Sequence, residues 1–132
     1  MNNFNLLPGD RVIVPKSLLG LVQHHAIYDG NGHFYENKAG FGVVRTPFRD
    51  FFKDVEAVTE IRQFRGSDVQ LHTALARAEN LLGKRYHLAD FNCEHFADLI
   101  QFGRPRSKQV ETVAGIGLFA FLVWAASQLA RK

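Results

Sequence analysis

The sequence predicts an α+β fold in which an antiparallel β-sheet packs against helices, and a change of periodicity along the chain carries that prediction. Between residues 11 and 61, short β-branched or alternating runs are separated by turns rich in Gly, Pro and Asn, which is typical of consecutive antiparallel strands. After residue 67 the apolar residues recur every three or four positions, as in helices. The 132 residues, 46% hydrophobic and 22% charged, suffice for one folded domain.

Turn-forming residues set the limits of the expected strands, which cover the ranges 11–15, 21–28, 33–37, 41–45 and 56–61. The Asp29–Gly32 run is a hairpin signal, because Gly and Asn tolerate positive φ. Thr46 followed by Pro47 is typical of a helix N-cap with proline at the first helical position, so a short helical turn is expected up to Phe52.

Two longer helices are expected after the strands. Ser67 caps the first helix, whose apolar stripe ends at Gly83. The second runs from about Cys93 to Phe102, and either Asn92 or Asp90 can cap it.

The C-terminal segment is apolar on every face. No residue from Thr112 to Ala130 is charged, and a helix of this length would measure about 28 Å, close to the hydrocarbon thickness of a bilayer. More cations precede the segment than follow it, which indicates a membrane anchor with the folded part in the cytoplasm. Gly115 and Gly117 favour the alternative, a buried helix packed closely on the domain.

The composition restricts the possible partners. The formal net charge is +3, and no basic block is interleaved with aromatic residues, so no nucleic-acid partner is expected. One cysteine excludes an intrachain disulfide and suits a reducing compartment. The expected location is therefore a membrane facing the cytoplasm or the cytoplasm itself, and the oligomeric state stays open.

Cys93 is the candidate nucleophile, because the start of a helix favours a thiolate and its N–H groups could hold an oxyanion. The alternative interpretation is a small buried core residue. Cys93 and His95 stand two apart, roughly 200° around a helix, so they cannot bind one ion together. No metal and no cofactor are predicted, and Glu94, His95 and Asp98 would otherwise be solvated or structural helix residues.

A histidine for this cysteine lies in the strand 21–28. Alternation places His24 and His25 on opposite faces, so only one of them can reach Cys93. Across the hairpin turn, Glu36 lies close to where it could orient an imidazole. These residue types form a thiol–imidazole–carboxylate relay, in which the base takes the thiol proton and the third group fixes the ring.

Two segments, Leu82–Leu88 and Asn92–Phe96, resemble the signature block of the lecithin retinol acyltransferase-like (LRAT) proteins, circularly permuted relatives of papain-like cell-wall cysteine peptidases. The Pro8–Asp10 and His24–Gly30 runs are similar to the opening strand and the histidine motif of that family. The resemblance implies an LRAT-like catalytic domain, 1–106, with a permuted papain-like fold, and an apolar C-terminal helix, 107–132. Such an anchor is frequent in the family.

The resemblance also implies roles for individual residues. Cys93 matches the nucleophile, and His24 matches the base because it opens the histidine motif, whereas His25 falls where an aromatic residue is usual. The third polar residue, commonly a second histidine, falls at Glu36, with His33 as the alternative if the turn has another register.

The expected activity is thiol-dependent acyl transfer or acyl hydrolysis of lipid-like esters through an acyl-cysteine, with a lipid or acyl-ester substrate and the membrane as partners. A cysteine peptidase or amidase of the same fold and a non-catalytic membrane-tethered adaptor are the alternatives. The lipid, the acyl acceptor and the choice between hydrolysis and transfer stay open.

Overall fold

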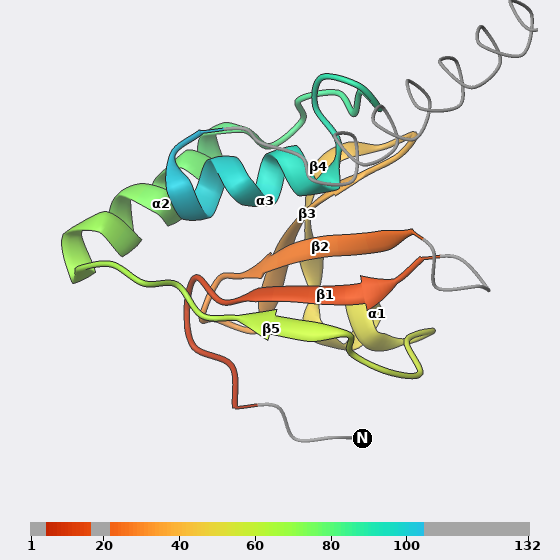
Figure 1. Ribbon diagram of the computed structural model, residues 1–132, viewed down its shortest axis with the longest axis horizontal. Coiled ribbons are helices and arrows are strands. Elements are labelled where there is room, and N and C mark those ends of the chain that lie inside the picture. Colours follow the sequence, from red (N-terminus) through yellow and green to blue (C-terminus); the bar gives the residue numbers. More distant parts are fainter. Residues whose placement is uncertain (1–4, 17–21, 105–132) are drawn as a thin grey trace, which may run out of the picture.

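The computed structural model describes residues 5–16 and 22–104, which form a five-stranded antiparallel sheet with helices on both faces (Figure 1). The strand order is β4-β3-β2-β1-β5. The elements in chain order are β1 Arg11–Pro15, β2 Gln23–Tyr28, β3 His33–Lys38, β4 Gly42–Pro47, α1 Phe48–Phe52, β5 Glu60–Arg62, α2 Asp68–Asn80 and α3 Cys93–Phe102. The predicted α+β class with an antiparallel sheet is confirmed, while the permuted relation to papain-like peptidases stays a prediction.

None of the helices within these two ranges is long and apolar enough to cross a membrane. The predicted C-terminal helix, 107–132, lies outside the described residues, so both interpretations of that segment stay open.

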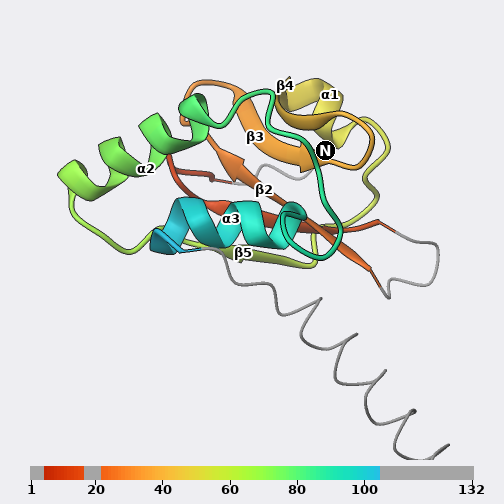
Figure 2. The same ribbon diagram turned by 90° about the horizontal axis from the view of Figure 1, so that it is seen from above.

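The two faces of the sheet carry separate apolar clusters. Ile27 and Tyr35 face α2 and α3, where they pack with Phe96 and neighbouring side chains. Ala26 and Phe34, one residue earlier on the same strands, face the other way and pack with α1. Figure 2 shows α2 and α3 on one side of the sheet. Because both faces are covered, β2 and β3 are buried on both sides, unlike strands that alternate between core and solvent.

The pairing of β2 is uneven along its length, and this positions the site. All of β1 pairs with β2, from Arg11 opposite Ile27 to Pro15 opposite Gln23. The ladder between β2 and β3 is shorter and ends at Ala26 opposite Glu36. Nearer its start, β2 therefore keeps β1 on one side while its pairing with β3 has ended on the other.

Two predicted boundaries were wrong. Thr46 does not cap α1, because it is still part of the β3–β4 ladder opposite Phe34, and Pro47 becomes the N-cap without a side-chain hydrogen bond. Of the predicted strand 56–61 only residues 60 and 61 pair with β1, and β5 continues to Arg62; Val58 instead packs against the α1 cluster. The predicted caps Ser67 and Asn92 are confirmed, and both take part in reciprocal capping boxes.

The segment that leads to α3 is fastened to β4. The N–H of Val43 donates to the carbonyl oxygen of Lys84, 2.9 Å away, and the N–H of Gly83 donates to the carbonyl oxygen of Val43 at the same distance. Gly42 has φ +81°, and a Cβ there would lie 2.4 Å from the Lys84 oxygen. The close approach of these two backbones therefore requires glycine at position 42.

We predict that Gly42→Ala lowers the free energy of unfolding more than Gly40→Ala does. Both glycines have positive φ, which costs alanine about 1–2 kcal/mol, but only Gly42 faces a backbone oxygen; nothing lies within 4 Å of a Cβ at Gly40. Urea denaturation of the two variants measures the difference. An equal decrease in the free energy of unfolding for both variants would show that the backbone at Lys84 can move away from the added methyl group without loss of stability.

Candidate active site

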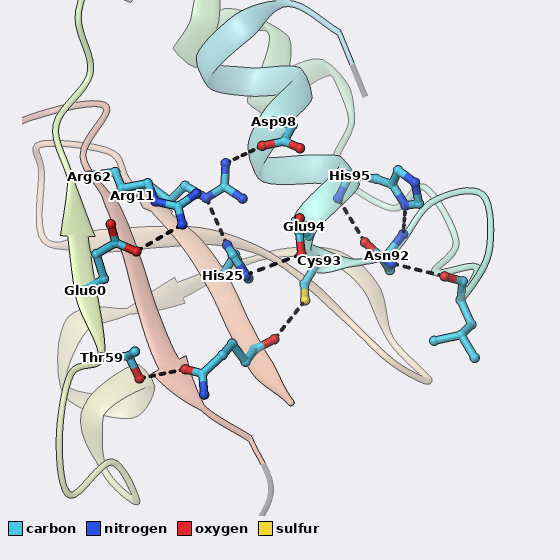
Figure 3. Close-up of polar contacts among 12 residues, drawn as sticks. Arg11, His25, Thr59, Glu60, Arg62, Asn92, Cys93, Glu94, His95 and Asp98 are labelled. Atoms are coloured by element: carbon cyan, nitrogen blue, oxygen red, sulfur yellow. Dashed lines mark hydrogen bonds and ion pairs between the residues drawn. The ribbon is translucent and has the colours of Figure 1, made fainter. Parts of the chain in front are cut away.

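Cys93 is the first residue of α3, and its sulfur lies against the start of β2. Asn92 caps the helix by accepting a hydrogen bond from the N–H of His95 at 2.9 Å. The Cys93 Sγ is 3.6 Å from the carbonyl oxygen of Gln23, as the dashed line in Figure 3 shows. The predicted helix-start position of the cysteine is confirmed.

The sulfur lies at the edge of β2 that is no longer paired with β3. The N–H of Tyr28 donates to Asp10 on the β1 side, and the carbonyl of Val22 accepts from Lys16 on that same side. The even-numbered residues of β2 therefore bond towards β1, so Gln23 and His25 direct their backbone groups towards the other edge. The sulfur meets this edge at the Gln23 carbonyl, and the backbone N–H of His25 donates to it.

His24 is held by Glu36 from the adjacent strand. The Nε2 atom of His24 is 2.8 Å from Oε1 of Glu36, and both side chains are nearly buried. Nδ1, the other ring nitrogen, is buried, and the ring interacts electrostatically with Cys93. The structure thus brings together the three residues singled out from the sequence: Cys93, His24 and Glu36. His33, the alternative third residue, lies at the other end of the hairpin, where its Nδ1 is 3.1 Å from the Asn31 carbonyl.

The electrostatics of the site favour an ion pair. Burial lowers the pKa of His24, but hydrogen bonds to Cys93 and Glu36 outweigh it and raise the pKa to about 9. Burial raises the pKa of the Cys93 thiol, yet His24 and the N–H of His25 outweigh burial and leave that pKa below its ordinary value. Burial likewise raises the pKa of Glu36, and His24 reverses the effect. All three pKa shifts act in the direction of a thiolate–imidazolium pair supported by a carboxylate.

His25 points to the opposite face and belongs to a buried polar network beneath α3 (Figure 3). The Nε of Arg11 donates to Nδ1 of His25 at 2.9 Å, and Nη1 of Arg11 donates to Oδ1 of Asp98 at 2.5 Å. The Nε2 of His25 is 3.8 Å from a Glu94 oxygen. Burial and Arg11 lower the pKa of His25 to about 3, so the ring is neutral and can accept from the arginine.

The sequence did not identify two residues that position the site. Arg11 is fully buried although it reads as an ordinary strand residue, and its partner Asp98 is 87 residues away. Asn37 donates to the carbonyl oxygens of Phe91 at 2.9 Å and Asn92 at 3.3 Å, directly before Cys93. An asparagine in a fully buried strand is the one signal that could have indicated such a role.

Of the two interpretations for the polar residues of α3, the structural one is correct and the solvated one is wrong. Glu94 and Asp98 are buried on the sheet side of the helix. His95 accepts a hydrogen bond from the N–H of Asn92 in the capping box.

A thiol at a helix start, an imidazole on one strand and a carboxylate on the next give this α+β protein the three groups of a thiol–imidazole–carboxylate site. The chain belongs to the lecithin retinol acyltransferase family, whose family model matches residues 5–106. It is also similar to phospholipase A and acyltransferase 3 of Mus musculus, with 41% identity over 58 residues. That alignment covers 38% of this chain and 36% of the mouse protein, so the chain matches about a third of its relative.

We predict that iodoacetamide alkylates Cys93 with a pH midpoint below the ordinary thiol value of 9, because His24 favours the thiolate. In His24→Asn the cation is absent and burial remains, so the midpoint should move above that value. Rates followed by mass spectrometry from pH 5 to pH 10 measure both midpoints. Since the residue is only 3% exposed, the midpoint rather than the absolute rate is compared. Identical midpoints in the two proteins would contradict the ion pair.

We predict that Asp98→Ala destabilises the fold by about 3–5 kcal/mol, because it leaves the buried Arg11 guanidinium without its carboxylate. The matched control is Asp90→Ala, whose side chain is 82% exposed and pairs with an exposed histidine; its effect should stay within about 0.5 kcal/mol. Thermal and urea denaturation measure both. A loss at Asp98 as small as that at Asp90 would show that the network contributes little.

Proposed function

We propose that this protein is a thiol-dependent acyltransferase or acyl hydrolase that acts on lipid-like esters through an acyl-cysteine. The observation that carries the proposal is the approach of His24 to Cys93 while Glu36 holds the far ring nitrogen at 2.8 Å. Membership of the lecithin retinol acyltransferase family and similarity to a protein named phospholipase A and acyltransferase support the choice of ester and lipid.

In the first half-reaction the Cys93 thiolate attacks the carbonyl carbon of the ester. The negative charge that forms on the carbonyl oxygen is stabilised by the positive end of α3, at whose first residue the sulfur is placed. As the intermediate collapses, the imidazolium of His24 gives its proton to the departing alkoxide. The products are a free alcohol and an acyl-thioester on Cys93, with His24 neutral.

In the second half-reaction neutral His24 takes a proton from the acceptor, which is water, an alcohol or an amine. The acceptor attacks the thioester carbonyl, and the collapse of the intermediate expels the thiolate and restores the ion pair. Glu36 stays ionised throughout; its hydrogen bond fixes the orientation of the ring beside Cys93. The carboxylate therefore acts on the rate through the orientation and charge of His24.

The balance between transfer and hydrolysis depends on how much water reaches the thioester. Cys93 is 3% exposed, an environment that restricts water and favours an acceptor delivered with the substrate. We further propose that the C-terminal segment 107–132 holds the domain at a bilayer, where acyl esters are concentrated, because its residues 112–130 carry no charge.

We predict a fatty-acyl mass on Cys93 when the full chain is incubated with phospholipid vesicles and analysed by intact mass spectrometry. Cys93→Ala should carry no such mass and show no turnover, because the acyl group has no acceptor sulfur. A peptide panel run in parallel tests the peptidase alternative. Turnover of the lipid ester by Cys93→Ala would refute the nucleophile.

We predict that Glu36→Gln lowers kcat/KM by about 10²-fold, since a neutral amide stabilises the imidazolium less. The matched control is His33→Gln, which changes the other candidate for the third residue at the far end of the hairpin and should leave kcat/KM within about twofold. Steady-state kinetics on one ester measure both variants. The reverse order of effects would assign the third role to His33.

A further inference from the structure

The end of the molecule that carries Cys93 also carries exposed apolar side chains on separate turns. Phe41, in the turn between β3 and β4, is 73% exposed, and Leu88, in the segment before α3, is 72% exposed. Val22, beside the strand residue whose carbonyl meets the sulfur, is 47% exposed. Leaving such apolar side chains exposed to water is unfavourable unless something covers them.

The backbone places these turns side by side. Hydrogen bonds between Val43 and the pair Gly83 and Lys84 fasten the β3–β4 hairpin to the segment before α3, and Figures 1 and 2 both show the two running together at this end. The Asn92 side chain donates to the Leu88 carbonyl at 3.1 Å, which fixes Leu88 close to the helix start. The apolar side chains and the sulfur therefore belong to one end of the fold.

Cations surround the apolar side chains at this end. Lys38 lies over the ring of Phe41, with Nζ 5.2 Å from the ring centroid, and Lys16 lies over the ring of Tyr86 at 5.6 Å. Lys84 and Arg85 are exposed in the same segment as Leu88. The carboxylate of that segment, Asp90, is 3.4 Å from His87. Lysines that cover apolar rings can extend their charges outwards, as at a membrane surface.

A second group of exposed apolar residues has a different electrostatic character. Leu7, Ile61 and Phe102 are also exposed, but their surroundings include both Asp10 and Glu60 as well as arginines. Glu60 pairs with Arg62 at 3.0 Å. Such a mixed surface has no clear attraction for an anionic layer, so the cationic end is distinguished by its charge and by its closeness to Cys93.

We infer that the residues Lys16, Val22, Lys38, Phe41, Arg85 and Leu88 form a docking face for an anionic lipid surface. The side chains of Phe41 and Leu88 enter the headgroup region, and the cations pair with lipid phosphates or carboxylates. This docking turns the Cys93 end of the molecule towards the acyl esters, a step that rests on the proposed function. We assign lipid as the occupant because the exposed apolar side chains lie on separate turns and are surrounded by cations. Such an arrangement suits the surface of an anionic bilayer better than it suits a single protein ligand.

Hydrogen–deuterium exchange of the full chain on vesicles tests the face directly. With vesicles of equal parts phosphatidylcholine and phosphatidylserine, the amides of residues 39–42 and 85–90 should exchange more slowly, while those of the first turn of α2 should not change. Vesicles of phosphatidylcholine alone should give much less protection. Equal protection on both vesicles, or none in the two turns, would overturn the inference.

A pair of matched double variants measures the strength of the contact. Arg85→Gln with Leu88→Ser should lower partition of the full chain into the mixed vesicles by about tenfold, since one cation alone contributes about fivefold. Arg65→Gln with Val69→Ser removes one cation and one exposed apolar side chain near the start of α2 and should change partition less than about twofold. Similar losses in both would overturn the inference.

The C-terminal segment is the same in all these proteins, so its contribution cancels in the comparison. Neither exchange nor partition requires turnover, which separates this inference from the proposed function. An acyl mass on Cys93 without protection of the two turns would leave the function standing and remove the docking face. Protection of the two turns without any acyl mass on Cys93 would support the docking face and contradict the proposed function.

Discussion

The contact between the Cys93 sulfur and the edge of β2 is the constraint on which the rest of the site depends. It exists because the β2–β3 ladder ends at Ala26 opposite Glu36, two residues before His24 is reached. A ladder continued to the start of β2 would occupy the backbone groups of Gln23 and His25 that the sulfur meets. The same divergence lets Glu36 reach diagonally to His24. One change in strand pairing therefore provides the place for the nucleophile and the support for the base.

Polar groups that would ordinarily weaken a core hold α3 over this edge. Arg11, His25, Glu94 and Asp98 meet between the helix and the sheet, and Asn37 holds the two carbonyls before Cys93. Desolvating such groups is costly, and apolar residues of equal volume often stabilise a fold more. Their directional contacts, however, fix the rotation and height of the helix in a way that apolar packing does not. At the other end, Arg77 donates to the Leu99 carbonyl and fastens the last turn.

The sequence was sufficient wherever local rules decide the structure. Alternation along one strand separated His24 from His25, capping residues placed Cys93 at a helix start, and the hairpin turn set the register of Glu36. The sequence was insufficient where contacts between residues far apart in the chain determine the structure. Arg11 meets a carboxylate 87 residues away, and neither residue type indicates the pairing. The limits of β5 likewise depend on β1, since only residues 60–62 find ladder partners there.

The neutral state of His25 shows why two adjacent histidines behave differently. Cys93 and Glu36 beside His24 raise its pKa to about 9, whereas burial and Arg11 lower the pKa of His25 to about 3. A protonated His25 would place a second cation beside Arg11 under the helix, and burial together with the arginine prevents this. Burial and Arg11 thus confine the imidazolium to one face of the sheet. The buried network beneath α3 and the ion pair at the β2 edge are therefore parts of one electrostatic arrangement.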